Sequence, residues 1–252
     1  MLLCVSRMQK IEVLLGTVCD YYRTSGRAYL PWRQTKNPYR ILVSEVMLQQ
    51  TQVDRVLPKY KLFVKKFPTA AALAKAPLSE VLLVWSGLGY NRRAKMLHSA
   101  AKIVTSEHRG VFPKTTLELE ALPGVGYYTA CAVAIFAFNK PQVCIETNIR
   151  TVFTHVCFSK KKTVSDKEIL PLIEKTLARA LQRGIHPKDL YAGLMDYGSY
   201  LKKSGVRVNS KSKHYAKQSK FEGSARQKRA AKLRARLKAG ASDEELEKLL
   251  HS

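Results

Sequence analysis

Cysteine is scarce in this 252-residue chain, and none follows Cys157. The five cysteines stand at positions 4, 19, 131, 144 and 157; none forms a C-x-x-C pair, and their number is odd. This pattern excludes a disulfide framework and is typical of a reducing, intracellular environment. Cys131 lies among Ala and Val residues, which predicts a small core residue.

Long apolar segments are also missing. The longest uncharged run, 121–139, contains a proline and two glycines, so no transmembrane helix is predicted. The first ten residues have too short an apolar stretch for a signal peptide. We therefore expect an intracellular protein that does not act on membranes, with the bacterial cytoplasm as its compartment. The basic segments also fit a nuclear or organellar import signal, although DNA binding explains them equally well.

Acidic residues are few. The chain has 44 Lys and Arg against 19 Asp and Glu, a net charge of +25. Such an excess repels itself and indicates a polyanionic partner, with nucleic acid favoured over an acidic protein or a membrane surface. Residues 202–238 hold 14 Lys or Arg and one acid, Glu222. This stretch fits either a solvated, mobile tail or a clamp on the DNA backbone. Ser242 and Glu245 then form a capping box for a short helix that ends near Leu250.

Strand-like alternation persists nowhere, whereas helical periodicity dominates. The pattern predicts an all-α protein with short connections and no repeats. The expected helices span residues 9–24, 38–49, 52–66, 69–75, 78–87, 91–107, 115–121, 127–139, 146–158, 166–182 and 186–203.

The most informative stretch is residues 122–126, Leu-Pro-Gly-Val-Gly, which precedes the apolar helix expected from Tyr127. Two glycines around one apolar residue predict a tight hairpin. A hairpin that opens onto a helix presents free backbone N–H groups, which suit a phosphate. In so basic a chain we expect a DNA phosphate, bound by the backbone of Gly124, Val125 and Gly126.

Three further segments strengthen this interpretation: SEVMLQQTQV at 44–53, CIETNIRTVF at 144–153 and SGLGYNRRAKMLH at 86–98. Together with the hairpin and LPWR at 30–33, they resemble the helix-hairpin-helix (HhH-GPD) DNA glycosylases, and the MutY-type adenine glycosylases in particular. The resemblance covers roughly residues 25–200. It implies a six-helix barrel at 31–139, a second helical domain built from 1–30 and 140–205, an active cleft between them, and a monomer that binds duplex DNA. Residues 206–252 form a basic C-terminal extension.

Breaking an N-glycosidic bond requires a protonated leaving base and a stabilised sugar cation, a division of labour that suits two carboxylates. Glu45 shares a helix face with Ile41, Leu42 and Leu48. Alone, it fits an ion pair or a helix edge as well as a desolvated acid. The resemblance implies that Glu45 protonates the adenine.

Glu146 opens a helix, where a carboxylate is favoured as a cap. The resemblance implies a second role, stabilising the sugar cation or attacking C1′. The family normally has Asp here, so the extra methylene puts rate and substrate choice in question. Asn148 matches an Asn that orients this carboxylate.

Tyr128 stands where bifunctional relatives such as endonuclease III carry the Lys that forms a Schiff base, so we expect no lyase activity. Alone, Tyr128 also fits a buried barrel aromatic.

The remaining site residues come from the resemblance, and each has a core or surface explanation when taken alone. A flipped base leaves a gap in the duplex that a wedge must fill. The implied wedge and DNA contacts are Gln49, Gln50, Thr51, Tyr90, Arg92 and Arg93, and the implied adenine pocket residues are Trp32, Arg33, Leu48 and Asp196.

The chain departs from the family in two ways. Most members hold a [4Fe–4S] cluster on four cysteines; the corresponding positions here fall near Lys202, Asn209, Ser212 and Gln218, so we expect no cluster, no metal and no other cofactor. We expect residues 214–229 to replace the cluster loop, with packing through Tyr215 and Phe221. The family's C-terminal 8-oxoguanine recognition domain also has no counterpart in this sequence, so weaker discrimination of 8-oxoguanine from guanine is expected.

The sequence therefore predicts a monofunctional glycosylase that removes adenine opposite 8-oxoguanine or guanine in base excision repair. One alternative is a thymine or uracil glycosylase for G mismatches on the same fold. A second alternative is a non-catalytic protein that binds damaged DNA.

Overall fold

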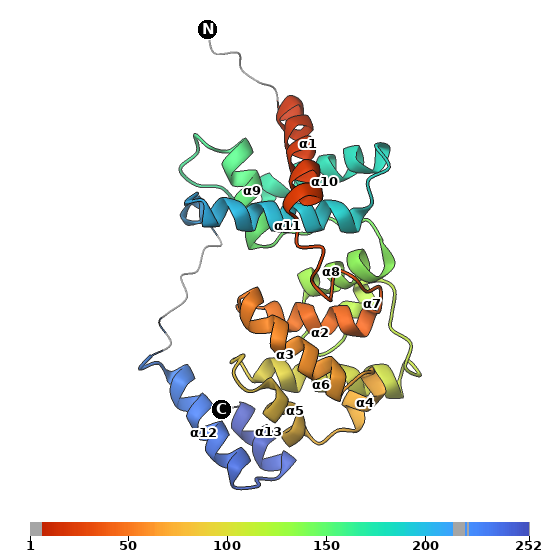
Figure 1. Ribbon diagram of the computed structural model, residues 1–252, viewed down its shortest axis with the longest axis vertical. Helices are drawn as coiled ribbons and strands as arrows, with labels where there is room; N and C mark the ends of the chain where they lie inside the picture. The colour runs from red at the N-terminus through yellow and green to blue at the C-terminus, as the bar shows by residue number, and fades with distance from the viewer. Residues whose placement is uncertain (1–6, 214–219, 221, 252) are drawn as a thin grey trace. The chain divides into compact units, whose positions relative to one another are not determined.

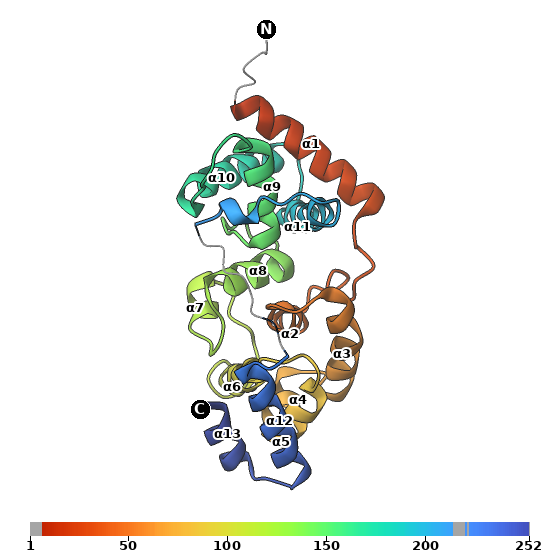
Figure 2. The same ribbon diagram turned by 90° about the vertical axis from the view of Figure 1, so that its left-hand side faces the viewer.

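The computed structural model describes residues 7–213, 220 and 222–251, and in these residues the chain is helical (Figures 1 and 2). The one β-type pairing among them is an isolated parallel bridge between Val164 and Ser212. None of the helices described is long and apolar enough to cross a membrane. The expected all-α class is thus confirmed.

The chain divides into two compact units, and the division falls inside helix α8 (Tyr127–Phe138). Unit 1 comprises residues 1–34 and 134–217; unit 2 comprises residues 35–133 and 218–252. Both units are discontinuous in sequence. Glu45, Tyr128 and the hairpin belong to unit 2, whereas Glu146, Asn148 and Asp196 belong to unit 1.

Unit 1 is built on four helices: α1 (Arg7–Ser25), α9 (Thr147–Cys157), α10 (Asp166–Gln182) and α11 (Pro187–Lys203). α11 packs against both α9 and α1, and α10 packs against α1, α9 and α11. Fully buried side chains such as Leu15, Phe153 and Leu194 form its core. Two glycines let α11 approach its neighbours closely. A Cβ added at Gly193 would lie 2.8 Å from Val18 Cγ1, and one added at Gly198 would lie 2.2 Å from the backbone oxygen of Asn148.

Unit 2 contains a larger set of helices around a core that includes Trp85, Phe63 and Met47, each with no measurable exposure. Its helices are α2 (Pro38–Leu48), α3 (Val53–Lys66), α4 (Ala70–Lys75), α5 (Leu78–Trp85), α6 (Arg92–Ser106), α7 (Thr116–Glu120), the first half of α8 (Tyr127–Phe138), α12 (Ala225–Lys238) and α13 (Asp243–His251).

The described part of the C-terminal extension is not an unstructured tail. Residues 225–238 form α12, a helix that the sequence analysis did not predict, because seven Lys and Arg with only two Leu give no apolar stripe. α13 follows and contacts α5 and α6. Its predicted capping box is present: Glu245 N–H donates to Ser242 Oγ at 3.3 Å, and Ser242 N–H donates to Glu245 Oε2 at 3.0 Å.

Candidate active site

Glu45 lies on α2, whose N-terminus is fixed by its sequence. Asn37 caps the helix by accepting from Arg40 N–H at 3.1 Å, and Pro38 occupies its first turn. The residues of α2 on either side of Glu45 are buried, and Glu45 itself is only 7% exposed. Glu45 therefore lies on the buried side of the helix.

The C-terminal end of α2 lies beside the start of α8. Gln49 Nε2 donates to Thr129 Oγ1 at 3.4 Å. Glu45 stands one turn before Gln49, and the half-buried Tyr128 immediately precedes Thr129. In unit 2, Glu45 and Tyr128 therefore lie on either side of the contact between α2 and α8.

Two wedge candidates, Gln50 and Tyr90, have left-handed backbones with φ of 54° and 48°. Non-glycine residues seldom adopt this conformation, and such strain is concentrated at functional sites. Arg93 ties their two loops together. Its Nη1 donates to the carbonyl oxygens of Val46 (2.7 Å), Met47 (3.0 Å) and Gln49 (2.6 Å).

The other arm of the same guanidinium reaches the second loop. Arg93 Nη2 donates to Thr51 Oγ1 at 3.2 Å and to the Gly89 carbonyl at 3.1 Å. Burial lowers the pKa of Arg93 to about 10, which still leaves it charged at neutral pH. Arg93, expected among the DNA contacts, has an internal role in the structure: it caps the last carbonyls of α2. Arg92, its neighbour, is exposed.

The predicted hairpin forms between α7 and α8. Gly124 has φ of +75°, and a Cβ there would lie 2.5 Å from Met96 Cβ, so this glycine is required by both backbone and packing. Val125 N–H donates to the Leu122 carbonyl at 3.1 Å, so this amide closes the turn within the protein. Gly126 differs from Gly124, because a Cβ there would meet nothing within 4 Å.

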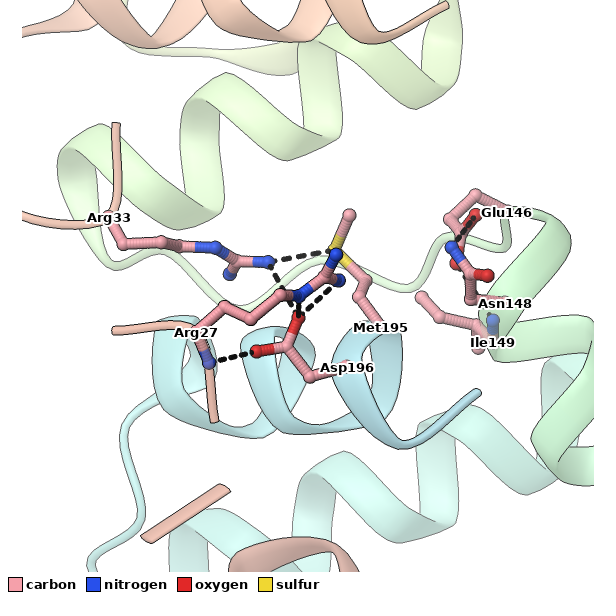
Figure 3. Close-up of polar contacts among 7 residues, drawn as sticks. All are labelled: Arg27, Arg33, Glu146, Asn148, Ile149, Met195 and Asp196. Carbon is pink, nitrogen blue, oxygen red and sulfur yellow. Dashed lines mark hydrogen bonds and ion pairs between the residues drawn. The ribbon is translucent and has the colours of Figure 1, made fainter. Parts of the chain in front are cut away.

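Glu146 is the N-cap of α9, and both of its carboxylate oxygens are held (Figure 3). Oε1 accepts from Ile149 N–H at 2.8 Å, and Oε2 accepts from Asn148 Nδ2 at 3.1 Å. The capping role and the predicted orientation by Asn148 are therefore both present. Asn148 Oδ1 is buried and has no hydrogen-bond partner within the described chain.

Burial raises the pKa of Glu146 above its ordinary value of 4.5. The hydrogen bonds from Asn148 and Ile149 oppose this shift, as do the charges of Lys202 and Arg150. Burial likewise lowers the pKa of Lys202, against the pull of Glu146. Lys202 was missed as a site residue in the sequence analysis. It stands one turn after Gly198 on α11, and that spacing is the signal that places it near the α9 N-terminus.

The acidic pocket candidate Asp196 is 3% exposed and fully engaged within unit 1 (Figure 3). Oδ1 accepts from Arg27 Nε and Nη2 at 2.9 and 2.6 Å, and Oδ2 accepts from Arg27 N–H at 2.7 Å. Arg33 lies 3.9 Å from the same carboxylate. Asp196 thus anchors the segment that follows α1, a role the sequence analysis did not anticipate.

Arg33 has a buried side chain, with its guanidinium 4.7 Å from the Phe136 ring and Nη2 3.6 Å from Met195 Sδ. Its Nη1 is buried and has no hydrogen-bond partner among the residues that the structure describes. The other pocket and wedge candidates differ in exposure: Trp32 is buried, Leu48, Thr51 and Tyr90 are half-buried, and Gln50 is exposed.

The residues at the family's cluster positions do not fit an iron–sulfur cluster. Asn209 accepts from Thr151 Oγ1 at 2.6 Å, Ser212 pairs with Val164, and Lys202 carries no ligand atom suited to iron. Val164 N–H donates to the Lys211 carbonyl at 2.8 Å and its carbonyl accepts from Lys213 N–H at 3.0 Å, so this segment is held by backbone hydrogen bonds. Gln218, Tyr215 and Phe221 lie outside the described residues.

Comparison with known proteins agrees with this geometry. Residues 43–179 match the family described as HhH-GPD superfamily base excision DNA repair protein. An adenine DNA glycosylase of Buchnera aphidicola subsp. Baizongia pistaciae is 36% identical over 189 residues, covering 75% of this chain and 53% of that protein. One from Mycolicibacterium smegmatis is 47% identical over 130 residues, covering 51% and 44% of the two chains.

The chain therefore spans about half the length of these curated relatives. Among solved structures, a thermostable thymine-DNA glycosylase is 26% identical with a TM-score of 0.65, covering 81% of this chain and 95% of that one. An endonuclease III–DNA complex is 21% identical with a TM-score of 0.60, covering 92% and 99%, and shows the shared fold. The chain belongs to the HhH-GPD superfamily of base excision DNA repair proteins.

Proposed function

We propose that the protein is a monofunctional DNA glycosylase that excises adenine mispaired with 8-oxoguanine or guanine. The observation that carries the proposal is the pair of hydrogen bonds that the Glu146 carboxylate accepts, from Ile149 N–H at 2.8 Å and from Asn148 Nδ2 at 3.1 Å. A carboxylate fixed in this way is preorganised to meet positive charge that develops on a sugar. Adenine is the base named for the curated relatives.

In the proposed reaction Glu45 donates a proton to a ring nitrogen of the flipped adenine. The C1′–N bond then breaks, its electron pair leaves with the base, and the sugar carries the positive charge. The Glu146 carboxylate stabilises that cation, and water adds to C1′ and releases a proton. The products are free adenine and an abasic site.

The environment of each carboxylate supports this division of roles. Glu45 lies on a buried helix face and is only 7% exposed, as suits a group that meets a base withdrawn from water. Glu146 receives two hydrogen bonds and the charges of Lys202 and Arg150, all of which favour its ionised form against the effect of burial.

Tyr128 supports base removal without strand cleavage, because a phenol cannot form a Schiff base with the sugar. Tyr128→Lys tests this point. The wild-type protein should leave strands intact until alkali is added, and borohydride should trap no covalent adduct. The variant supplies the missing amine and should give an adduct; trapping with the wild type would contradict the proposal.

The DNA-binding part of the proposal rests on the hairpin and the charge. Gly126 faces open space, so a phosphate can approach the start of α8 without a steric clash. Gln50 and Tyr90 have the strained backbones expected of residues that enter the duplex. We propose that the protein acts as a monomer on duplex DNA inside the cell, without a cluster or other cofactor. Iron analysis of the purified protein tests the last point, and stoichiometric iron would overturn it.

A thymine or uracil glycosylase for G mismatches is the second candidate, because a thymine-DNA glycosylase matches 81% of this chain in structure. The decisive experiment incubates excess enzyme with labelled duplexes that carry A opposite 8-oxoguanine, A opposite G, or T opposite G. Adenine release that disappears in Glu45→Gln supports the proposal. Thymine release alone supports the second candidate. Tight binding without release of any base supports the non-catalytic alternative.

A further inference from the structure

The C-terminal helices α12 and α13 form a hairpin that is fastened to unit 2 (Figures 1 and 2). Asp243, the first residue of α13, accepts from Leu78 N–H at 2.7 Å and from Ser79 N–H at 3.0 Å. It thereby caps α5, whose own N-cap Pro77 offers no side-chain hydrogen bond.

Two further interactions hold α13 in place. Leu246 is completely buried, and Glu247 Oε2 lies 3.3 Å from Nζ of the buried Lys95. α12 contributes one buried anchor, Leu233, which is 4% exposed. α13 is therefore anchored on α5 and α6, and α12 packs against α13.

α12 is unusually basic for a helix in a fixed position. Its 14 residues hold seven Lys and Arg and no acid. Three of them, Arg226, Arg229 and Arg234, line a groove of about 1010 Å³ on unit 2. Gln50, Tyr90 and Gly124, from the wedge loops and the turn before α8, line the same groove.

The charge of this groove is one-sided. The residues that line it include six arginines and, among those described, no Asp or Glu: Arg55, Arg92, Arg93, Arg226, Arg229 and Arg234. Arginine forks bind phosphate in a bidentate manner, and a groove with one sign of charge concentrates its counter-ion. The six arginines favour a polyanion over a small neutral ligand.

α12 also interacts directly with one of the wedge candidates. Arg226 Nη1 donates a hydrogen bond to Tyr90 Oη, and the guanidinium carbon lies 5.3 Å from the centre of the Tyr90 ring. The Arg93 guanidinium lies 5.4 Å from the same centre. Two cations therefore hold the ring of a residue whose backbone is already in the left-handed conformation.

We propose that α12 forms one wall of a phosphate-binding groove for duplex DNA, with Arg226, Arg229 and Arg234 as the phosphate ligands. Arg226 in addition is a positioning residue for Tyr90. The inference deepens the proposed function, since it assigns binding of the DNA backbone to a helix outside the HhH-GPD match at residues 43–179.

The test compares two triple variants of α12 that remove equal charge. The groove variant is Arg226→Ala, Arg229→Ala, Arg234→Ala. The control is Lys228→Ala, Lys232→Ala, Arg236→Ala, whose residues are exposed and do not line the groove. Alanine favours helix, so both variants should retain α12, which circular dichroism checks.

Binding to an undamaged duplex is measured by fluorescence anisotropy over a range of salt. The groove variant should bind at least about tenfold more weakly than the control at about 0.15 M salt. Its slope of log K against log salt should flatten by roughly 0.9 for each phosphate that the variant no longer neutralises. Equal weakening in the two variants would overturn the proposal, because it would mean a diffuse effect of net charge.

A binding measurement on undamaged DNA keeps this inference separate from catalysis. A wild-type protein that binds through the groove but releases no base would contradict the proposed function alone. A wild-type protein that releases adenine while both triple variants behave alike would contradict the groove alone. Arg226→Gln, which removes one of the three charges, is the milder variant and should show about a third of the slope change.

Discussion

Arg93 Nη1 lies 2.6 Å from the carbonyl oxygen of Gln49, at the point where α2 ends and the wedge loop begins. The same guanidinium reaches Gly89 in the loop before α6, at 3.1 Å. One half-buried cation thus joins two loops that are distant in sequence, and the left-handed residues Gln50 and Tyr90 flank the junction. The hydrogen bonds of Arg93 therefore hold both loops in their left-handed conformations.

Removing this cation should destabilise unit 2. Arg93→Ala leaves several carbonyls at the end of α2 without a donor, so we expect a loss of about 3 kcal/mol, or a fall in Tm of roughly 6–12 °C. Arg92→Ala is the matched control, because Arg92 is exposed, and it should change stability by no more than about 0.5 kcal/mol. Thermal unfolding measures both, and equal effects would show that the network around Arg93 is not structural.

Glu146→Gln should separate stability from activity. Gln retains an acceptor for Ile149 N–H, so the cap survives, while the rate of base release falls by at least about 10³-fold because no anion faces the sugar. Burial raises the pKa of Glu146 in the folded state, so its ionised form costs stability at neutral pH. The variant should therefore be more stable than the wild type at pH 7.

That gain has a defined pH dependence. It should shrink as the pH falls through the raised pKa of Glu146 and vanish below the ordinary value of 4.5, where the carboxyl is neutral in both folded and unfolded chains. Urea denaturation at several pH values measures it. A variant that is less stable than the wild type at pH 7 would show that the charged carboxylate stabilises the fold.

Lys202 should set the pH at which the rate of base release falls on the acid side of the pH profile. Its charge lowers the pKa of Glu146, so Lys202→Ala raises that pKa further. Because the ionised carboxylate is the active form, the low-pH limb of the single-turnover rate should move to higher pH. Lys203→Ala, at the exposed neighbouring position, should leave the limb unchanged. The pH profiles of the three proteins decide the matter.

Gly198 should prove essential for the placement of Glu146. A Cβ there would lie 2.2 Å from the backbone oxygen of Asn148, so Gly198→Ala must separate α11 from the start of α9. We expect a loss of about 1–3 kcal/mol and a fall in rate that exceeds what this loss of stability explains, since a shift of about 1 Å in a catalytic group costs roughly 10²-fold.

Gly16 provides the control for this substitution. It lies within α1 and has nothing within 4 Å of an added Cβ. Gly16→Ala should therefore stabilise the protein by about 0.5–1 kcal/mol and leave the rate of base release unchanged. Thermal unfolding together with single-turnover kinetics distinguishes the two variants. A Gly198→Ala protein with normal rate and stability would mean that α11 and α9 separate without cost.

The sequence by itself determined the helical class, most helix positions and the Gly124 turn, because these follow from local periodicity and backbone chemistry. It also determined the capping box at Ser242 and the position of Glu146 at a helix start, which depend on residues three apart.

Only the tertiary structure decided what distant side chains do. Arg92, Arg93 and Arg226 all line the groove, yet Arg92 is exposed, Arg93 donates to the carbonyls of α2 and Arg226 stacks on Tyr90, since each role depends on which carbonyl or ring the fold brings near. Asp196 likewise became an anchor for Arg27, 169 residues away in the chain. Hydrophobic periodicity did not predict α12, because this helix has no apolar stripe. α12 packs instead on α13, which Asp243 and Leu246 hold in place.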